Sequence, residues 1–518
     1  MQPNLSAGAS RTRTWHAPAE VLAAFIAFEE REQLFDRQLL GVAYWQLIRQ
    51  DIFRETLQLL GLAANAHLRL EQLPLQQWLL PQLRQLPTTL RRSRFTHLPP
   101  AELLVATHPR YLQHRGQYIC PYSQPLLWGT PHSRALLTGH YQGQYFAPDA
   151  GERTGYVDLG LAWAHAVFKL RELARSGFTG EQQRELAALA TRWAEQLGAA
   201  ASTAWSQAWQ RRARTAVLTS VGLTPWFERL LDRMRPRLVV EVVGYRLVNQ
   251  LLTLSARGRG IPVAELQHGT IGASHAAYNF APGRKPAAFP DHLLTFGEIW
   301  RELTPGLPLP AAQVHAVGYG WLELQRAAYA PNRAAPGHAR RILFISQRDI
   351  GAELAAVACE LQARSQQRYE LVYRLHPSEA PDWRERYPQL VSAGIRVELA
   401  QERPLYAAQA AADVQVGVYS TALIEGIAFG LSTCVIALPG HEQLAFLWER
   451  GLARRAENAE QLSQLLDTPA AISGTSSAAL WAPNARQRFA QFVDHTLAPN
   501  RAAASQRSSV DSGGGNVA

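Results

Sequence analysis

The sequence has little cysteine and no long apolar run. Its three cysteines, Cys120, Cys359 and Cys434, are far apart and form neither a CxxC pair nor a zinc-type spacing. This argues against a disulfide framework and a structural metal, and fits a reducing compartment. No run of about 18 apolar residues occurs, and the N-terminal segment lacks the apolar region of a secretory signal. We therefore expect a cytoplasmic protein that is neither exported nor membrane-spanning.

Several catalytic motifs are also missing. There is no GxxxxGK[ST] loop, no GxGxxG after a strand, no HExxH and no GxSxG. These absences exclude the commonest NTPase, dehydrogenase, zinc-protease and hydrolase classes. The carboxylates at Glu29, Glu30 and Glu379 form no DxD pattern and are interpreted as features of a single helix face. We expect no metal and no bound cofactor.

Positive charge is in excess, with 52 Lys and Arg residues against 42 Asp and Glu, a net charge of +10. Such a balance suits nucleic acid, anionic membrane or anionic substrates. Arginines are scattered along expected helices, such as 211–214 and Arg454–Arg455, without a compact basic tract carrying aromatics. We therefore expect no nucleic-acid partner. Peripheral attraction to anionic lipid, at the inner face of the cytoplasmic membrane, remains open.

Length and periodicity predict the domain organisation. At 518 residues with 47% hydrophobic content, the chain suits two α/β domains plus extensions. Residues 1–15 and the Ser/Gly/Ala-rich tail 498–518 are expected to be flexible. Apolar residues at helical spacing predict an α-helical N-terminal subregion over 16–95.

Strand and helix patterns alternate in the rest of the chain. The pattern predicts a first Rossmann-like domain, 96–304. Its expected elements are a strand at 103–106, a short strand at 135–137, helices at 180–197 and 225–234, a strand–helix–strand unit over 236–266 and a strand at 293–296. A proline-rich linker, 305–338, follows and includes the apolar run 314–317. The same alternation predicts a second such domain, 339–497. Its expected strands are 341–346, 370–375, 395–399, 414–418 and 433–438, and its expected helices are 352–365, 405–411, 421–429 and 443–451. The predicted fold class is α/β, with two doubly wound parallel sheets facing a cleft.

A polar cluster follows the strand 261–266 of the first domain, where open α/β sheets bind ligands. It consists of Gln267, His268, Gly269 and Thr270. A histidine near neutral pKa can take a proton from a hydroxyl acceptor, so His268 is the candidate base. The alternative is a structural histidine that bonds the loop backbone. Other candidates nearby are Glu265 and Asp291, as the base or its orienting partner, and His275 and Tyr278, as acceptor contacts or loop supports.

The second domain has three polar loops at predicted strand ends. If Ser420 caps the helix that begins at Thr421, its free N–H groups and dipole make an anion site. Glu425 lies one turn later and could accept ribose hydroxyls. The alternatives are a simple helix cap and a solvated carboxylate. The other candidate donor-binding residues are Ser346, Gln347 and Arg348 after one strand, Arg374, His376 and Pro377 after the next, and Tyr419 before Ser420.

Three motifs resemble, in their order along the chain, those of GT-B-fold transferases of bacterial surface polysaccharides. The motifs are Gln267–Thr270, Arg374–Pro377, and Tyr419–Thr421 with Glu425. They are similar to capsule-synthesis transferases and to CDP-glycerol glycerophosphotransferases, and CMP-sugar transferases share the His-Pro pair. The resemblance covers residues 236–445. It implies that His268 and its loop face the acceptor, that His376, Ser420 and Thr421 bind the donor nucleotide and phosphate, and that Glu425 binds the ribose.

Two departures from that pattern are informative. Gln267 stands where the teichoic-type loop usually has tryptophan, and Val418–Tyr419 replaces an aspartate before the Ser pair. Sugar transfer is therefore favoured over glycerophosphate transfer. The resemblance implies an inverting, metal-independent glycosyltransferase that uses a CMP-, CDP- or UDP-linked sugar and a cell-surface polysaccharide or lipid-linked acceptor. The alternatives are a non-hydrolysing nucleotide-sugar 2-epimerase and a non-catalytic polysaccharide assembly or binding protein.

Overall fold

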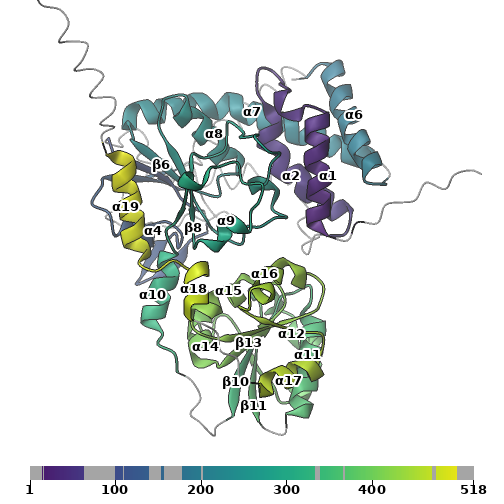
Figure 1. Cartoon of the computed structure of the whole chain (residues 1–518). Helices are drawn as coiled ribbons and strands as arrows, with labels where there is room; N and C mark the ends of the chain where they lie inside the picture. Colours follow the sequence, from purple (N-terminus) through teal and green to yellow (C-terminus); the bar gives the residue numbers. More distant parts are fainter. Residues whose placement is uncertain are drawn as a thin grey trace, which may run out of the picture.

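The computed structural model describes residues 15, 17–62, 100–108, 110–138, 153–156, 178–199, 202–332, 339–365, 368–468 and 474–498. Within these ranges the chain forms a helical block and two parallel sheets (Figure 1). The expected flexible ends, apart from Trp15 and Ala498, and residues 63–95 of the expected helical subregion lie outside the described residues. No helix in these ranges is long and apolar enough to cross a bilayer.

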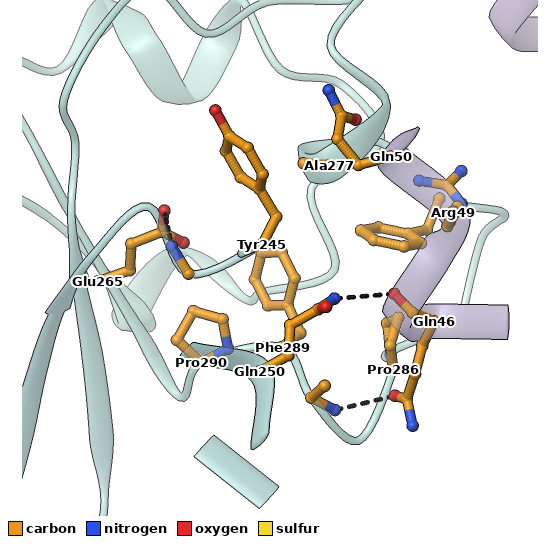
Figure 2. Close-up of a pocket in the computed structure, with 13 residues that line it drawn as sticks. Gln46, Arg49, Gln50, Tyr245, Gln250, Glu265, Ala277, Pro286, Phe289 and Pro290 are labelled. Carbon is orange, nitrogen blue, oxygen red and sulfur yellow. Dashed lines mark hydrogen bonds between the residues drawn. The ribbon is translucent and has the colours of Figure 1, made fainter. Parts of the chain in front are cut away.

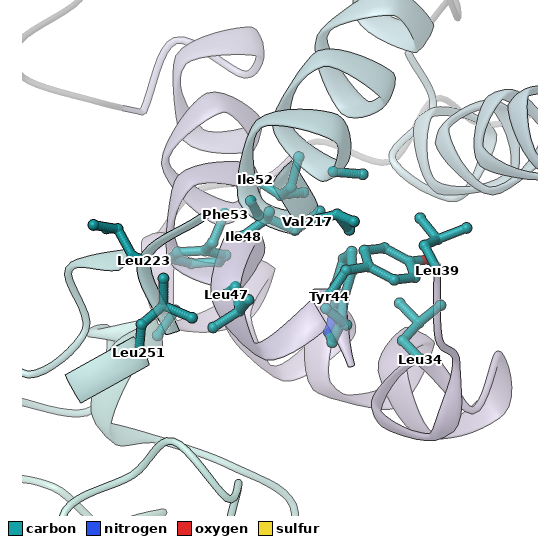
Figure 3. Close-up of a cluster of buried hydrophobic side chains, with 14 of the residues drawn as sticks. Leu34, Leu39, Tyr44, Leu47, Ile48, Ile52, Phe53, Val217, Leu223 and Leu251 are labelled. Carbon is teal, nitrogen blue, oxygen red and sulfur yellow. The ribbon is translucent and has the colours of Figure 1, made fainter. Parts of the chain in front are cut away.

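The helical block joins the beginning of the chain to a later pair of helices. It contains α1 (Pro18–Arg31), the 3-10 helix η1 (Leu34–Asp36), α2 (Tyr44–Leu59), α6 (Gly180–Gln196) and α7 (Thr203–Met234). Figure 3 shows the inward face of α2, including Ile48 and Ile52, against Val217 of α7 and Leu251 of α8 (Leu247–Arg257). The block therefore shares one core with the first sheet. Helix α7 begins well before the expected residue 225, because Pro225 lies inside the helix rather than at its start.

The first sheet has seven parallel strands in the order β5-β4-β1-β6-β7-β8-β9. In chain order they are β1 (Leu103–Ala106), β4 (Arg134–Thr138), β5 (Arg153–Tyr156), β6 (Leu238–Val242), β7 (Val263–Leu266), β8 (His292–Thr295) and β9 (Val314–Ala316). Between β1 and β4 lie a hairpin, β2 (Leu112–His114) with β3 (Gln117–Ile119), and the short helix α4 (Gln124–Leu127).

The second sheet has six parallel strands in the order β12-β11-β10-β13-β14-β15. In chain order they are β10 (Arg340–Ile345), β11 (Tyr369–Arg374), β12 (Arg396–Glu398), β13 (Val414–Gly417), β14 (Ser432–Ile436) and β15 (Arg454–Ala456). Its helices are α11 (Gly351–Arg364), α12 (Trp383–Arg386), α13 (Pro388–Ser392), α14 (Leu405–Ala411), α15 (Thr421–Ala428), α16 (Ala445–Glu449) and α17 (Ala459–Asp467). The predicted fold class, two doubly wound parallel sheets with N-terminal helices, is confirmed by this topology.

Two domain boundaries and one element differ from the sequence-based expectation. Part of the expected linker 305–338 belongs to the first domain, because β9 pairs with β8 and α10 (Gly320–Ala328) packs against α4. The expected second domain ended at 497, but α19 (Ala485–Leu497) packs against β6 and α4 of the first domain. Arg454 and Arg455 lie on the edge strand β15 rather than on a helix. A short apolar segment does not show which sheet it will join.

Candidate functional site

A pocket lies between the two domains at the carboxyl ends of the central strands. The first domain contributes the loop after β7 and an aromatic wall, and the second contributes the start of α15. Helix α18 (Gly474–Leu480) leads into the last lining residue. The pocket is lined by Tyr122, His268, Gly269, Thr270, Phe296, Trp300 and Tyr319 of the first domain, by Thr421, Ile424 and Glu425 of the second, and by Trp481. The two groups of residues predicted from separate strand ends therefore meet.

His268 lies half-buried in this pocket in its neutral form. Its Nε2 atom is 3.1 Å from the hydroxyl of Tyr245. Its Nδ1 atom is buried and has no hydrogen-bond partner among the described residues. Burial, helped by the nearby charges of His275, His108 and Arg246, lowers the pKa of His268 to about 3. Nδ1 is thus the ring nitrogen that no protein group of the described residues engages.

Glu265 does not line this pocket, which is a correction to its candidacy as the base. It is 1% exposed on β7, where its Oε1 accepts hydrogen bonds from the backbone N–H of Gly244, at 2.8 Å, and the hydroxyl of Tyr278, at 2.6 Å. Burial raises the pKa of Glu265 to about 7. Its carboxyl group lines a different cavity, between α2 and the first sheet.

Asp291 lies at the opposite edge of the sheet, which is a second correction. It exchanges hydrogen bonds with Val263 at the amino-terminal ends of β7 and β8. Its carboxylate is 3.5 Å from Arg257 and 3.6 Å from Lys285. Because His268 follows the carboxyl end of β7, Asp291 cannot orient it, and its role is to fix the strand starts.

Three of the five expected acceptor contacts hold the loop instead of facing the pocket. The Gln267 side chain is 1% exposed, accepts from the N–H of Phe296 at 2.8 Å and donates to Gly269 at 2.9 Å. Tyr278 is fully buried, and the His275 ring packs against it, with ring centroids 4.9 Å apart. Of the predicted set, Gly269 and Thr270 line the pocket.

The start of α15 forms the opposite wall. The Ser420 Oγ accepts a hydrogen bond from the N–H of Ala422 at 3.3 Å, so Ser420 caps the helix as predicted. Thr421 and Glu425, one turn apart, line the pocket. Burial raises the pKa of Glu425 to about 7, against the opposing effects of a hydrogen bond from Tyr406 and the charge of Arg110. Burial therefore favours the protonated form of this carboxyl group.

Gln347 and Ser346 organise the loop that precedes α11. The Gln347 Oε1 accepts from the N–H of Tyr419 at 3.4 Å, so two predicted donor loops touch. The Ser346 side chain is 2% exposed and donates to the Glu379 carboxylate at 2.9 Å. Ser346 is therefore a support for the loop, and neither it nor Gln347 nor Tyr419 lines the pocket.

Arg374 does not present its charge to the pocket, which is a third correction. Its guanidinium is 2.6 Å from the Glu398 carboxylate on β12 and 2.9 Å from the carbonyl oxygen of Arg403. Arg374 is 6% exposed and Glu398 is 1% exposed. A buried arginine that is already paired offers little charge to a phosphate. Arg348 is similarly paired, at 2.8 Å, with Asp382.

His376 is exposed at the end of β11 and caps the 3-10 helix η5 (Pro377–Glu379). Its Nδ1 accepts from the N–H of Ser378 at 3.3 Å and lies 2.8 Å from the Ser378 hydroxyl. The proton of the neutral ring is therefore on Nε2, the atom that could donate to an anion.

Sequence reasoning missed the part played by Glu379 and Arg110. Glu379 is fully buried and accepts from Ser346, from the Tyr387 hydroxyl at 2.6 Å and from the N–H of His376 at 2.6 Å. It is the centre of a buried network, and its reading as a helix-face residue was wrong. A His cap followed three residues later by Glu is a capping-box signal that could have revealed it.

Arg110 lies in the loop after β1, on the first-domain side, and its charge reaches Glu425. In the described ranges no group of three or more His, Cys, Asp or Glu residues is arranged to hold a metal ion.

The site and the two sheets define a two-domain α/β protein with a pocket between its domains. The chain matches no protein-family model and no curated protein sequence. Similar solved structures include the UDP-GlcNAc 2-epimerase of Neisseria meningitidis, at 10% identity, covering 76% of this chain and 98% of that one with a TM-score of 0.43. A putative UDP-N-acetylglucosamine 2-epimerase of Listeria monocytogenes has 11% identity, coverages of 77% and 98%, and a TM-score of 0.46.

The glycosyltransferase SnogD of Streptomyces nogalater has 17% identity to this chain, coverages of 77% and 99%, and a TM-score of 0.39. At such identities and scores a similarity says nothing about substrate or reaction. The function has to be argued from the residues of this chain.

Proposed function

We propose that the chain is a glycosyltransferase that moves a sugar from a nucleotide-activated donor to a hydroxyl group of a glycan or lipid-linked acceptor. The observation that carries this proposal is the interdomain pocket. On one side lies a neutral histidine with an unpaired buried nitrogen. On the other side, the pocket residues Thr421 and Glu425 belong to a capped helix. Ligands of open α/β sheets bind at this edge, and helix starts favour anions.

The proposed chemistry is an inverting displacement without a metal ion. The acceptor hydroxyl gives its proton to His268 Nδ1 while its oxygen attacks the anomeric carbon. For this, Nε2 carries the ring proton and donates a hydrogen bond to the Tyr245 hydroxyl oxygen. The bond between the anomeric carbon and the phosphate oxygen breaks on the opposite face, so the nucleotide leaves with both electrons.

The leaving nucleotide would be held by the second domain. The N–H groups at the start of α15, the Thr421 hydroxyl and the His376 Nε2–H would stabilise the phosphate charge. Arg110, whose charge reaches Glu425, would supply the cation that Arg374 cannot, because Arg374 is paired with Glu398. The Glu425 carboxylate would accept hydrogen bonds from the ribose hydroxyls.

The first test is a thermal-shift panel with CMP, CDP, UDP and GDP, followed by a transfer assay with sugar derivatives of the stabilising nucleotide. His268→Ala should abolish transfer, by at least about a hundredfold as expected for a lost general base, and leave nucleotide binding intact. His376→Ala should weaken nucleotide binding. His495→Ala, an exposed histidine on α19, is the matched control and should change neither.

Three outcomes would contradict the proposal. They are full transfer by both active-site variants, no nucleotide raising the melting temperature, and conversion of UDP-N-acetylglucosamine in the absence of any acceptor. The last would identify an epimerase. Transfer should also persist in EDTA, because the proposed chemistry uses no metal ion.

A further inference from the structure

A second cavity lies between the helical block and the first sheet, and the proposed reaction does not use it (Figure 2). Helix α2 forms one side, and the loops after β6 and before β8 form the other. The cavity is small, with a volume of about 30 Å³. It is lined by Gln46, Arg49, Gln50, Gly244, Tyr245, Gln250, Glu265, Ala277, Phe280, Pro286, Ala288, Phe289 and Pro290.

Three sets of hydrogen-bond donors on the cavity wall are already engaged. The Arg49 guanidinium donates to the Glu29 carboxylate at 2.6 and 2.9 Å, to the carbonyl oxygen of Asn279 at 2.9 Å and to that of Ala276. The N–H of Ala288 donates to the side chain of Gln46 at 3.0 Å, and the N–H of Gly244 donates to Glu265 at 2.8 Å. A ligand therefore finds no spare donor at these positions.

Acceptors, in contrast, are left over. Gln250 is 8% exposed, and its Nε2 donates to the Gln46 carbonyl oxygen at 2.8 Å, which fixes the amide orientation. Its Oε1 is buried without a partner among the described residues, and so is the Oε1 of Gln50. Unsatisfied buried acceptors carry a desolvation penalty that a donating ligand would remove.

The cavity also has carboxyl groups at its end and aromatic walls. Glu265 lies beside Glu241 in register on β6, and the Oε2 of Glu241 is buried without a partner in the described part of the chain. The rings of Tyr245, Phe280 and Phe289 line the sides. Aromatic faces next to a carboxylate favour a cation. Arg49 does not cancel this preference, because the buried Glu29 neutralises it.

An outer basin gives access from solvent. It shares Gln46 and Pro286 with the cavity and is bounded by Glu30, Phe35, Ala43, Pro282, Gly283, Arg284, Lys285 and Ala287. A ligand with a longer body could lie in this basin and extend one small group inward.

We propose that the inner cavity binds a primary ammonium group, with its N–H donors on Gln50, Gln250 and Glu265. An ammonium has three donors and no acceptor, which matches the unpartnered oxygens of Gln50 and Gln250. It is also small enough for the space available, and its positive charge would favour the ionised form of the Glu265 carboxyl group. The ligand class is a primary amine whose body occupies the outer basin.

The proposal is independent of the transfer reaction, although the two sites share one residue. Tyr245 lines this cavity, and its hydroxyl is the partner of His268 in the interdomain pocket. The experiment reads binding alone, so it stands or fails separately from the glycosyltransferase proposal.

The test uses methylammonium chloride as the probe, with the melting temperature and a calorimetric Kd as readouts. Sodium chloride and tetramethylammonium chloride at equal ionic strength are the controls, because neither cation carries an N–H donor. Methylammonium should raise the melting temperature and the controls should not. Equal shifts with all three salts, or no shift with methylammonium, would overturn the proposal and leave water as the occupant.

Two variants locate the site. Glu265→Gln keeps an acceptor for Gly244 and Tyr278 but cannot ionise beside a bound cation, and it should weaken methylammonium binding about tenfold or more, as expected for a hydrogen bond to a charged group. Gln50→Met, on the half-buried face of α2, should weaken it severalfold and guards against misfolding of the first variant. Glu353→Gln, exposed on α11, is the matched control. An unchanged Kd in both cavity variants would refute the assignment.

Discussion

Burial drives both Glu425 and His268 toward their neutral forms, although one is an acid and the other a base. The pKa of Glu425 is raised to about 7 and that of His268 is lowered to about 3. The two residues line the same small pocket, together with an aromatic wall. A pocket with both groups neutral avoids uncompensated buried charge. A bound phosphate would favour the charged histidine, so the ligand itself would make His268 a stronger base.

The raised pKa of Glu425 predicts a pH-dependent contribution to stability. The folded state holds the proton more tightly than the unfolded state, whose pKa is near 4.5. Stability relative to Glu425→Gln should therefore be highest below about pH 4.5 and fall as pH rises through about 7. At 1.36 kcal/mol per pKa unit the change is on the order of 1–3 kcal/mol. Melting temperatures of both proteins between pH 4.5 and 8 measure it.

Glu385→Gln, at an exposed position on α12, serves as the control for that measurement. Its melting curve should follow the wild type at every pH. Parallel curves for wild type and Glu425→Gln would show that the Glu425 carboxyl titrates normally.

For single residues, the sequence predicted which side chains lie near one another better than it predicted what each side chain does. His268, Thr421 and Glu425 meet in one pocket, because residues that follow parallel strands share an edge. The roles of Arg374 and Glu265 could not be predicted, because each is fixed by a distant partner. Arg374 pairs with Glu398 across neighbouring strands, and Glu265 accepts a hydrogen bond from Tyr278 in a loop. Apolar periodicity carries no information about such pairs.

Among the elements, α15 lies unusually close to the sheet that supports it. A Cβ atom at Gly426 would come within 2.0 Å of Oε1 of the buried Gln415 on β13. That amide cannot easily move, because its Nε2 donates to the Leu423 carbonyl oxygen at 2.6 Å and to the Thr433 hydroxyl at 2.8 Å. The absence of a side chain at Gly426 thus sets the distance between α15 and β13. That distance in turn sets the position of Glu425.

Gly426→Ala should lower stability by about 2–3 kcal/mol, as expected for overpacking of a buried contact. It should also weaken nucleotide binding, because the helix start would be displaced. Denaturation and the nucleotide thermal-shift panel measure the two effects. Gly258→Ala, where a Cβ would meet its nearest atom at 3.5 Å, is the control and should be neutral or slightly stabilising. Equal stability of the two variants would disprove the packing argument.

Most elements were predictable from apolar runs, and helix 405–411 was predicted with the bounds that α14 has. The edge strands were harder. β15 carries two arginines, which read as part of an exposed helix, and β9 is only three residues long and follows a proline-rich stretch. Edge strands are half-solvated, so their sequences lack the continuous apolar signal of central strands.

In the whole molecule, the segment around α18 ties the two domains together. The Trp481 indole N–H donates to the Ile424 carbonyl oxygen of α15 at 3.2 Å, and its ring packs on Phe296 of the first domain, with centroids 5.1 Å apart. The Trp300 indole donates to the Leu480 carbonyl oxygen at 3.0 Å. One tryptophan thus touches both walls of the pocket.

Trp481→Ala should loosen the domains relative to each other. We expect a larger radius of gyration in small-angle X-ray scattering and faster deuterium exchange in α15 and the segment after β8. Trp383→Ala, on α12 inside the second domain, is the matched control, and it should lower the melting temperature without changing the radius of gyration. An identical scattering profile for wild type and Trp481→Ala would contradict the proposed link.

The position of α19 has a consequence for how the protein is made. Its residues Phe489, Phe492, Val493 and Leu497 fill the same core as Leu103 and Val240 of the first sheet. The whole second sheet lies between these segments in the chain. During synthesis this apolar face of β1 and β6 therefore stays uncovered until α19 has left the ribosome. The domain that starts first is the one that finishes folding last, which exposes the nascent chain to aggregation for most of its synthesis.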